Sequence, residues 1–280
     1  TGSVAQRLAD TPGVARTILG AARAARGMPG ADPRAMSHSW LFTGPPGSGR
    51  SLAAIDFAAA LMCTDPEEPG CGRCEACRAV LETKQHTDLV LVDPQEVIIP
   101  VDTVREVIGR AASLPTVAPW RVVIFNNADR LNNNGANALL KTVEEPPART
   151  VIIMCAPSDA PEDFSQTLRS RCRHLYIPSP SVKSITSQLV SEGASDHDAH
   201  LAALTSLRHV GRARRLVNDP AVQKRRAVAI NLAEEVFHGS QGFQAVTSLL
   251  KMVDAEAKDS HKEQEEAELA KLEQTLGVGA

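Results

Sequence analysis

The chain has 280 residues, a formal net charge of −3 and a sequence pI near 6.2, and 43% of its residues are hydrophobic but only 3% aromatic. This balance argues against strong independent binding to DNA, which depends on neutralising phosphates, and one Tyr and two Trp offer little for stacking on bases. No signal peptide and no apolar run of about 18 residues is visible, so we expect no membrane span and a cytoplasmic protein.

The first 178 residues are expected to form one α/β domain. An Ala- and Arg-rich helix is predicted over residues 14–26, followed by a Gly/Pro linker at 27–33. Beyond the linker, apolar strands that alternate with helices are predicted at 39–43, 88–92, 121–125, 150–155 and 174–177. This alternation predicts a parallel sheet with helices on both faces, whose ligand site lies beyond the carboxyl ends of the strands.

A Gly-rich turn joins the strand at 39–43 to an Ala-rich helix at 52–61, and it matches the phosphate-binding pattern G-x-x-x-x-G-K-S except at one position. Arg50 stands where a lysine would reach the β- and γ-phosphates, and a planar guanidinium does not guarantee the same geometry. The alternative is a strand-to-helix turn that binds nothing. The candidate nucleotide-binding residues of this loop are Gly47, Ser48, Gly49, Arg50 and Ser51.

The acidic residues of an ATP site are also altered. The strand at 121–125 runs into Asn126 and Asn127, where a hydrolysing enzyme needs an Asp for Mg²⁺ and a neighbouring acid to orient water. Asp129 lies two residues further on, out of register. We therefore expect little or no ATP hydrolysis and weak or no binding of ATP or ADP. An active ATPase that uses Arg50 and Asp129 remains the alternative.

Four cysteines cluster in a segment rich in Pro and Gly, with the spacing C-x7-C-x2-C-x2-C. Such a set suits a closed tetrahedral Zn²⁺ site with a structural role, because four protein ligands leave no position open for substrate. A pair of disulfides is the alternative, although disulfide frameworks are typical of small secreted domains. The expected metal ligands, in a module at 63–77 inserted in the α/β domain, are Cys63, Cys71, Cys74 and Cys77.

In this order, the Gly-rich loop, the four cysteines, the segment 137–147 (NALLKTVEEPP) and the triplet Ser170-Arg171-Cys172 resemble the bacterial clamp-loader AAA+ proteins. The resemblance extends to about residue 240 and implies an AAA+ P-loop domain. The eroded acid pair is similar to that of the members that do not hydrolyse ATP. The resemblance thus implies a subunit with no catalysis of its own, in a DNA polymerase holoenzyme (a nucleotidyltransferase) that acts in DNA replication.

The resemblance also implies partners. These are the other clamp-loader subunits, gamma/tau ATPase and delta, in a hetero-pentamer, whereas the sliding clamp and primer-template DNA are met only through the assembly. In the family, the arginine matched by Arg171 acts as a finger in the ATP site of the neighbouring subunit. The residues alone also allow another interpretation, in which Arg169, Arg171 and Arg173 cap the end of a short helix at 164–169 and pair with surface acids.

After Pro178, only helical periodicity is found, with helices predicted near 181–192, 197–206, 211–217 and 220–238. The resemblance assigns 179–239 to a helical lid domain, and its G-x-x-R pattern implies that Arg214 touches a bound nucleotide. The alternative for Arg214 is a basic solvated face.

The last segment, 240–280, is expected to begin a helical collar domain that the chain does not complete. A helix is predicted to about residue 254, followed by a stretch rich in Glu and Lys. A further functional hypothesis is a zinc-dependent nucleic-acid-binding protein unrelated to clamps, which would bind DNA alone and in a salt-sensitive way.

Overall fold

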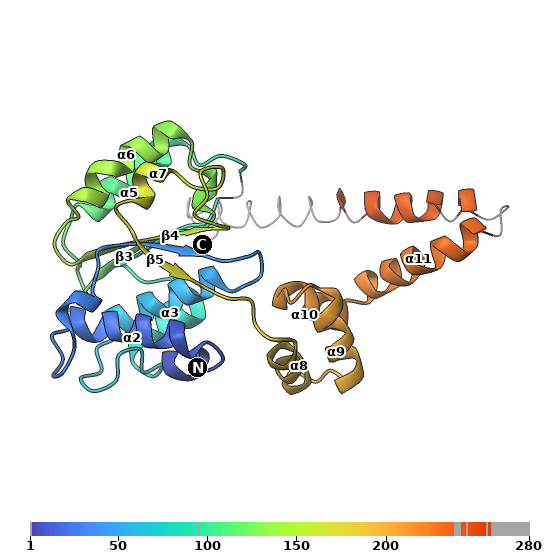
Figure 1. Cartoon of the computed structure of the whole chain (residues 1–280), viewed down its shortest axis with the longest axis horizontal. Coiled ribbons are helices and arrows are strands. Elements are labelled where there is room, and N and C mark those ends of the chain that lie inside the picture. The colour runs from blue at the N-terminus through green and yellow to red at the C-terminus, as the bar shows by residue number, and fades with distance from the viewer. Residues whose placement is uncertain (1, 95, 238–241, 245, 256, 259–280) are drawn as a thin grey trace, which may run out of the picture.

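The computed structural model describes residues 2–94, 96–237, 242–244, 246–255 and 257–258 (Figure 1). An α/β body at the amino-terminal end of the chain is followed by a small helical domain. The body is built on a five-stranded sheet in the order β2-β3-β4-β1-β5, with every neighbouring pair parallel. Its strands are β1 (Ser39–Thr43), β2 (Leu89–Val92), β3 (Arg121–Phe125), β4 (Thr150–Ala156) and β5 (Arg173–Tyr176).

Helices cover both faces of this sheet (Figure 1). One face carries α2 (Pro12–Ala25) and α3 (Arg50–Met62), and the other carries α5 (Val101–Ala111), α6 (Asn133–Glu144) and α7 (Gln166–Arg169). Five short helical elements were not predicted, namely α1 (Val4–Arg7), the 3₁₀ turn η1 (Pro33–Ala35), α4 (Glu75–Arg78), the π-helical turn η2 (Ala79–Thr83) and the 3₁₀ turn η3 (Ala128–Arg130). The fold class expected from the sequence is confirmed, and each strand lies within one residue of its predicted range.

The two helical layers are separate cores because successive strand residues face opposite sides of the sheet. Trp40 and Phe42 of β1 pack with α2 and α3, whereas Leu41 between them packs with the layer of α5 and α6. The Trp40 ring meets Phe57 of α3 edge-on at a centroid distance of 5.1 Å. The strands β1, β3 and β4 are buried along their whole length, as expected inside a parallel sheet, whereas the edge strand β5 is partly exposed.

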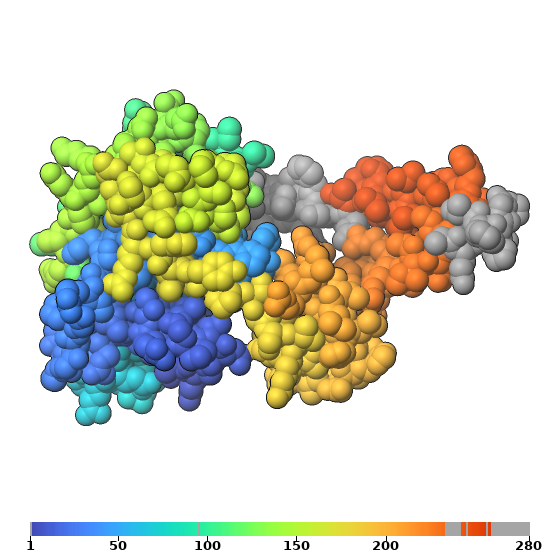
Figure 2. All heavy atoms as spheres, in the orientation of Figure 1, coloured from blue at the N-terminus to red at the C-terminus, as the bar shows by residue number. Residues whose placement is uncertain are grey.

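The helical domain consists of α8 (Val182–Ser191), α9 (Asp196–Thr205) and α10 (Val210–Asn218), and α11 (Pro220–Phe237) leads away from it. Figure 2 shows this domain as a separate lobe beside the α/β body. Ile185, Leu189 and Ala213 form part of its own apolar core. A hydrogen bond from the Ser184 hydroxyl to the carboxylate of Asp10 ties α8 to the body.

The carboxyl-terminal prediction is only partly covered. Residues 242–244, 246–255 and 257–258 are helical, which agrees with the helix predicted to about residue 254. The rest of the expected collar segment lies outside the described residues. Among the described helices, none is both long and apolar enough to cross a membrane.

Candidate functional site

The phosphate-binding loop has the backbone that its glycines predict. It leaves β1 at Gly44 and reaches α3 at Arg50, with Gly49 as the residue preceding the helix. Gly47 and Gly49 have φ angles of 83° and 91°, a left-handed conformation that residues with a Cβ rarely adopt. The loop closes on itself through a bond from Ser48 N to Pro45 O at 3.0 Å. The amino-terminal end of α3 is therefore shaped as a cradle for an anion.

Arg50, the cation of this loop, is hydrogen-bonded to the backbone of the same loop. Arg50 Nη1 donates to the backbone carbonyl of Gly44 at 2.7 Å. Burial lowers the pKa of Arg50, against the attraction of the nearby groups Cys155, Asp129 and Asp163. The guanidinium is thus held on a carbonyl at the start of the loop. Ser51, the last residue of the motif, is exposed on the first turn of α3.

The helical domain lies directly on the loop. His209, which precedes α10, contacts Gly47 so closely that a Cβ on Gly47 would collide with the imidazole ring. His209 Nδ1 also accepts a hydrogen bond from Arg212 N at 3.3 Å and so caps its own helix. This contact was not predicted, because nothing in the local sequence pattern around His209 points to the other domain.

A cleft of about 1010 Å³ remains between the loop and the helical domain. The predicted residues Gly47, Ser48, Gly49 and Arg214 all line it. Ser48 is 6% exposed, and its hydroxyl oxygen is buried without a hydrogen-bond partner. The structure therefore brings most of the predicted nucleotide-binding residues to one place.

The body contributes an ion pair to the same cleft. Arg7 Nε lies 2.5 Å from Asp56 Oδ1, and Asp56 is 2% exposed. Burial raises the pKa of Asp56, while the bond from Arg7 opposes that rise. This pair was not predicted, since Arg7 belongs to a helix too short to be recognised from its sequence.

Arg214 meets a partner of its own in this cleft. Its Nε and Nη2 donate to the two carboxylate oxygens of Glu192 at 2.8 and 2.6 Å. The bond to Glu192 raises the pKa of Arg214, and the same bond lowers the pKa of Glu192. This two-pronged pairing directs the Nε and Nη2 donors of Arg214 to a carboxylate of the same chain.

The position expected for a metal-binding acid is neutral. Asn126 follows β3 directly, is 8% exposed and donates its backbone N–H to Val92 O at 2.9 Å. Its side-chain Oδ1 is buried without a hydrogen-bond partner. Asp129 is exposed in the short 3₁₀ turn Ala128–Arg130.

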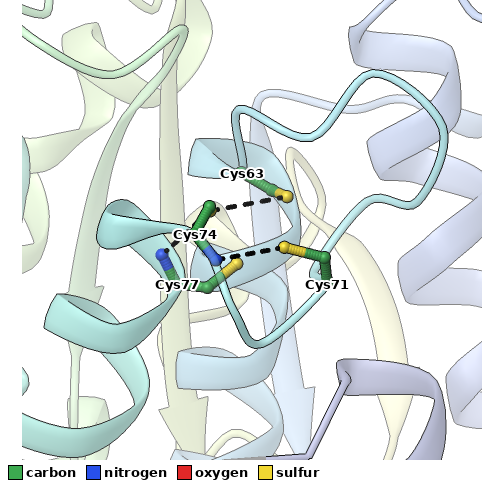
Figure 3. Close-up of side chains that lie close together, drawn as sticks. All are labelled: Cys63, Cys71, Cys74 and Cys77. Carbon is green, nitrogen blue, oxygen red and sulfur yellow. Dashed lines mark hydrogen bonds between the residues drawn. The ribbon is translucent and has the colours of Figure 1, made fainter.

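The four clustered cysteines converge at the end of α3 (Figure 3). Their sulfur atoms all lie within 4.8 Å of one another, and Cys63 and Cys74 are 3.9 Å apart. A tetrahedral ion with bonds of about 2.3 Å to sulfur would separate its ligands by roughly 3.8 Å. The set therefore fits a metal ion, and the predicted grouping of Cys63, Cys71, Cys74 and Cys77 is borne out.

Backbone N–H groups point at three of the four sulfurs, those of Cys63, Cys71 and Cys74. Asp65 N, Cys74 N and Cys77 N each point at a cysteine sulfur at 3.4 Å. A side-chain hydrogen bond from Cys77 lowers the pKa of Cys63 to about 4, and the same bond together with burial raises the pKa of Cys77.

The cysteine module is also anchored to the rest of the body. Val4 N of α1 donates to Gly70 O at 2.8 Å, and a Cβ on Gly70 would collide with the Val4 side chain. Arg73 pairs with Asp65 across the loop at 2.7 Å. The loop between the first two cysteines is thus held against α1 and α3 as well as by its thiols.

Arg171 lies just beyond α7, at the molecular surface. Its Nε is 2.5 Å from Glu144 Oε1, and its Nη1 donates to Thr167 O at 2.8 Å. The two neighbouring arginines have other attachments. Arg169 pairs with Asp159 at 3.0 Å, and Arg173 stacks over the Trp40 ring at 5.0 Å.

A parallel sheet of this order, a Gly-rich loop between β1 and α3, and a helical domain closing over that loop define a P-loop protein of the AAA+ class. A family model described as DNA polymerase III, delta subunit, matches residues 31–181. The chain belongs to this clamp-loader family, which confirms the resemblance seen in its motifs.

Curated relatives agree with this assignment. DNA polymerase III subunit delta' of Pseudomonas aeruginosa is 36% identical over 147 residues, which cover 51% of this chain and 44% of the relative. Subunit delta' of Bacillus subtilis is 29% identical and covers 74% of this chain and 61% of the relative. Subunit tau of Bacillus subtilis is 32% identical over 55% of this chain and 26% of the relative. The chain thus spans about half the length of the delta' relatives it matches.

Proposed function

We propose that this chain is a delta prime subunit of the DNA polymerase III sliding-clamp loader and does not hydrolyse ATP itself. The observation that carries the proposal is the internal pairing of the cations of its nucleotide site. Arg50 is bound to Gly44 O, and Arg214 is bound to Glu192. An ATPase needs a free cation on the phosphates and an acid for Mg²⁺, and Asn126 offers no charge. These features support weak or no binding of ATP or ADP.

Arg171 is the residue through which the chain would act on a neighbour. We infer that it serves as an arginine finger at the ATP site of an adjacent gamma/tau subunit. Its exposure supports this role, because only a surface arginine reaches another chain. Exposed ion pairs such as the one with Glu144 contribute only about 0–1 kcal/mol, so a phosphate can replace that partner.

The cysteine module is proposed to hold one structural Zn²⁺ through Cys63, Cys71, Cys74 and Cys77. When bound, the ion would tie the loop to the end of α3, and four thiolate ligands would leave no position for a reacting water. The proposed partners are the gamma/tau and delta subunits in a hetero-pentamer in the bacterial cytoplasm. Contact with the sliding clamp and primer-template DNA would occur only through this assembly.

ATP hydrolysis by the reconstituted loader tests the finger. We expect Arg171→Ala to lower kcat at the adjacent site by roughly 10³-fold or more, with folding and KM for ATP preserved. Arg171→Lys should recover little, because lysine lacks the planar fork. Arg16→Ala, at an exposed position on α2, is the matched control and should behave like the unaltered chain.

The isolated chain provides the second arm of the test. ATP turnover that is lost in Arg50→Ala but kept in Arg171→Ala would refute the proposal in favour of an active ATPase. Salt-sensitive DNA binding by the isolated chain, without affinity for other loader subunits, would favour a separate nucleic-acid-binding protein instead. Glu144→Gln removes the negative charge that pairs with Arg171 and should leave loader ATPase intact or raised.

A further inference from the structure

The short helix α7 packs its buried Leu168 into the core, and its side-chain hydrogen bonds to the loop after β4 converge on Asp159. Asp159 Oδ2 accepts a hydrogen bond from Arg169 Nε at 3.0 Å. The backbone carbonyl of Asp159 accepts another from Gln166 Nε2 at 2.9 Å. Because Gln166 and Arg169 are the first and last residues of α7, both ends of the helix are tied to the same point.

His174 of β5 connects this point to the start of the phosphate-binding loop. Its Nε2 lies 2.5 Å from Thr43 Oγ1, and its Nδ1 lies 3.5 Å from Arg169 Nη2 and 3.7 Å from Asp159 Oδ2. A guanidinium nitrogen can only donate, so Nδ1 is the accepting nitrogen of the neutral ring and Nε2–H donates to Thr43. Thr43 ends β1 and is 2% exposed, which makes it a rigid anchor.

The orientation of Arg171 depends on where α7 is held. Helices of so few residues have little stability of their own, since isolated helices need about 12–15 residues even to be marginal. Besides Glu144, the Arg171 guanidinium donates to Thr167 O and Ser170 Oγ, and the backbone N–H of Arg171 donates to Leu168 O at 3.0 Å; these three residues belong to α7 or follow it directly. A shift of α7 would therefore carry Arg171 with it.

We propose that Arg169 is a positioning residue for Arg171, acting with Asp159 and His174 to hold α7 on the sheet. The inference depends on the proposed role of Arg171 in a neighbour's ATP site. Arg169 points to the chain's own Asp159 and His174 and acts on the reaction only through the placement of Arg171. A misplacement of about 1 Å in a catalytic group can cost about 10²-fold in rate.

A double-mutant cycle in the reconstituted loader tests this role. We expect Arg169→Ala and Asp159→Ala each to lower kcat at the adjacent site by about 10- to 100-fold, with KM for ATP and incorporation into the complex unchanged. Arg169→Lys should recover part of the rate. The combined Arg169→Ala/Arg171→Ala variant should equal Arg171→Ala alone, because a positioning residue has nothing left to place.

Arg105→Ala is the matched control, since it breaks an exposed ion pair of 3.0 Å with Asp102 that lies within α5 and includes no residue of α7. If Arg169→Ala matches the unaltered chain, or if its effect multiplies with that of Arg171→Ala, the positioning role is refuted while the finger stands. If Arg171→Ala itself leaves the rate unchanged, the proposed function fails and this inference fails with it. If Arg169→Ala does not enter the complex, Asp159→Asn replaces it in the test. Its kcat, alone and combined with Arg171→Ala, is then judged in the same way.

Discussion

A buried ion pair between Asp88 and Arg121 holds the amino-terminal ends of β2 and β3 together. Asp88 is fully buried, and its Oδ1 accepts from Arg121 Nη2 at 3.0 Å and from Thr116 N at 2.7 Å. Its Oδ2 accepts from Val117 N at 2.7 Å and Ala118 N at 2.9 Å. Both carboxylate oxygens are therefore fully used, and we expect Asp88→Asn to be severely destabilising.

The size of the effect follows from the bonds that an amide cannot make. The substitution Asp88→Asn would place an NH₂ group against donors that now meet an oxygen, losing at least two charge-assisted hydrogen bonds of about 1.5–3 kcal/mol each. It would also leave Arg121 buried without a counter-charge, and breaking a buried pair costs about 3–5 kcal/mol. The loss of hydrogen bonds and the loss of the ion pair describe the same interactions, so their energies are not added. We expect the free energy of unfolding to fall by about 3–5 kcal/mol in total.

Urea unfolding followed by the fluorescence of Trp40 and Trp120 would measure this loss. Asp102→Asn, which breaks an exposed pair with Arg105, is the control and should cost less than about 1 kcal/mol. If Asp88→Asn lowers the free energy of unfolding by less than about 1 kcal/mol at pH 7, the buried pair does not stabilise the sheet in the way proposed.

The same experiment has a defined pH dependence. Burial alone would raise the pKa of Asp88, but the backbone donors at 116–118 and Arg121 outweigh it and hold that pKa well below its ordinary value. A lowered folded-state pKa means that the stabilisation is complete above the unfolded pKa of about 3.9 and is lost as the pH falls through the folded one. The difference in the free energy of unfolding between the unaltered chain and Asp88→Asn should be equal at pH 6 and pH 8. It should become smaller below roughly pH 4.

Two further substitutions probe the metal module and the phosphate-binding loop. Cys74→Ser should release zinc, measured by elemental analysis, and increase hydrogen exchange across residues 63–77. The control Cys155→Ala, in β4, should keep its zinc. Full metal retention by Cys74→Ser would contradict the proposed zinc site. Arg50→Lys should not confer ATP turnover on the isolated chain, because Asn126 still supplies no acid for Mg²⁺. Phosphate release above background by Arg50→Lys would show that the lysine was the only missing part.

The sequence predicted the strands well for a physical reason. The inner strands β1, β3 and β4 are short, buried, largely apolar runs, and the residues that follow them, such as Gly44 after β1 and Pro157 after β4, are strong signals. The helix α1 was missed because its four residues carry no recognisable periodicity. Its place is fixed by a tertiary contact, the bond from Val4 N to Gly70 O.

The candidate site was predictable only where its residues are close in the sequence. The cysteine spacing sufficed to predict the cluster of thiols, since all four cysteines lie within 63–77. The pairing of Arg214 in α10 with Glu192 at the end of α8 spans 22 residues, so no local sequence pattern predicts it. The contact of His209 with Gly47 joins two domains, so only the folded structure reveals it.

The two arginines of the predicted nucleotide site, Arg50 and Arg214, both bind acceptors within the chain. Neither arginine is fully buried, and each already donates to an acceptor of its own chain. Gly44 O serves Arg50 in this way, and Glu192 serves Arg214. The contact of His209 with Gly47 and the hydrogen bond from the Ser184 hydroxyl to Asp10 join the two domains. An arrangement held by contacts of the chain itself would suit a subunit that offers Arg171 to a partner at every stage of that partner's ATP cycle, as the proposed function requires.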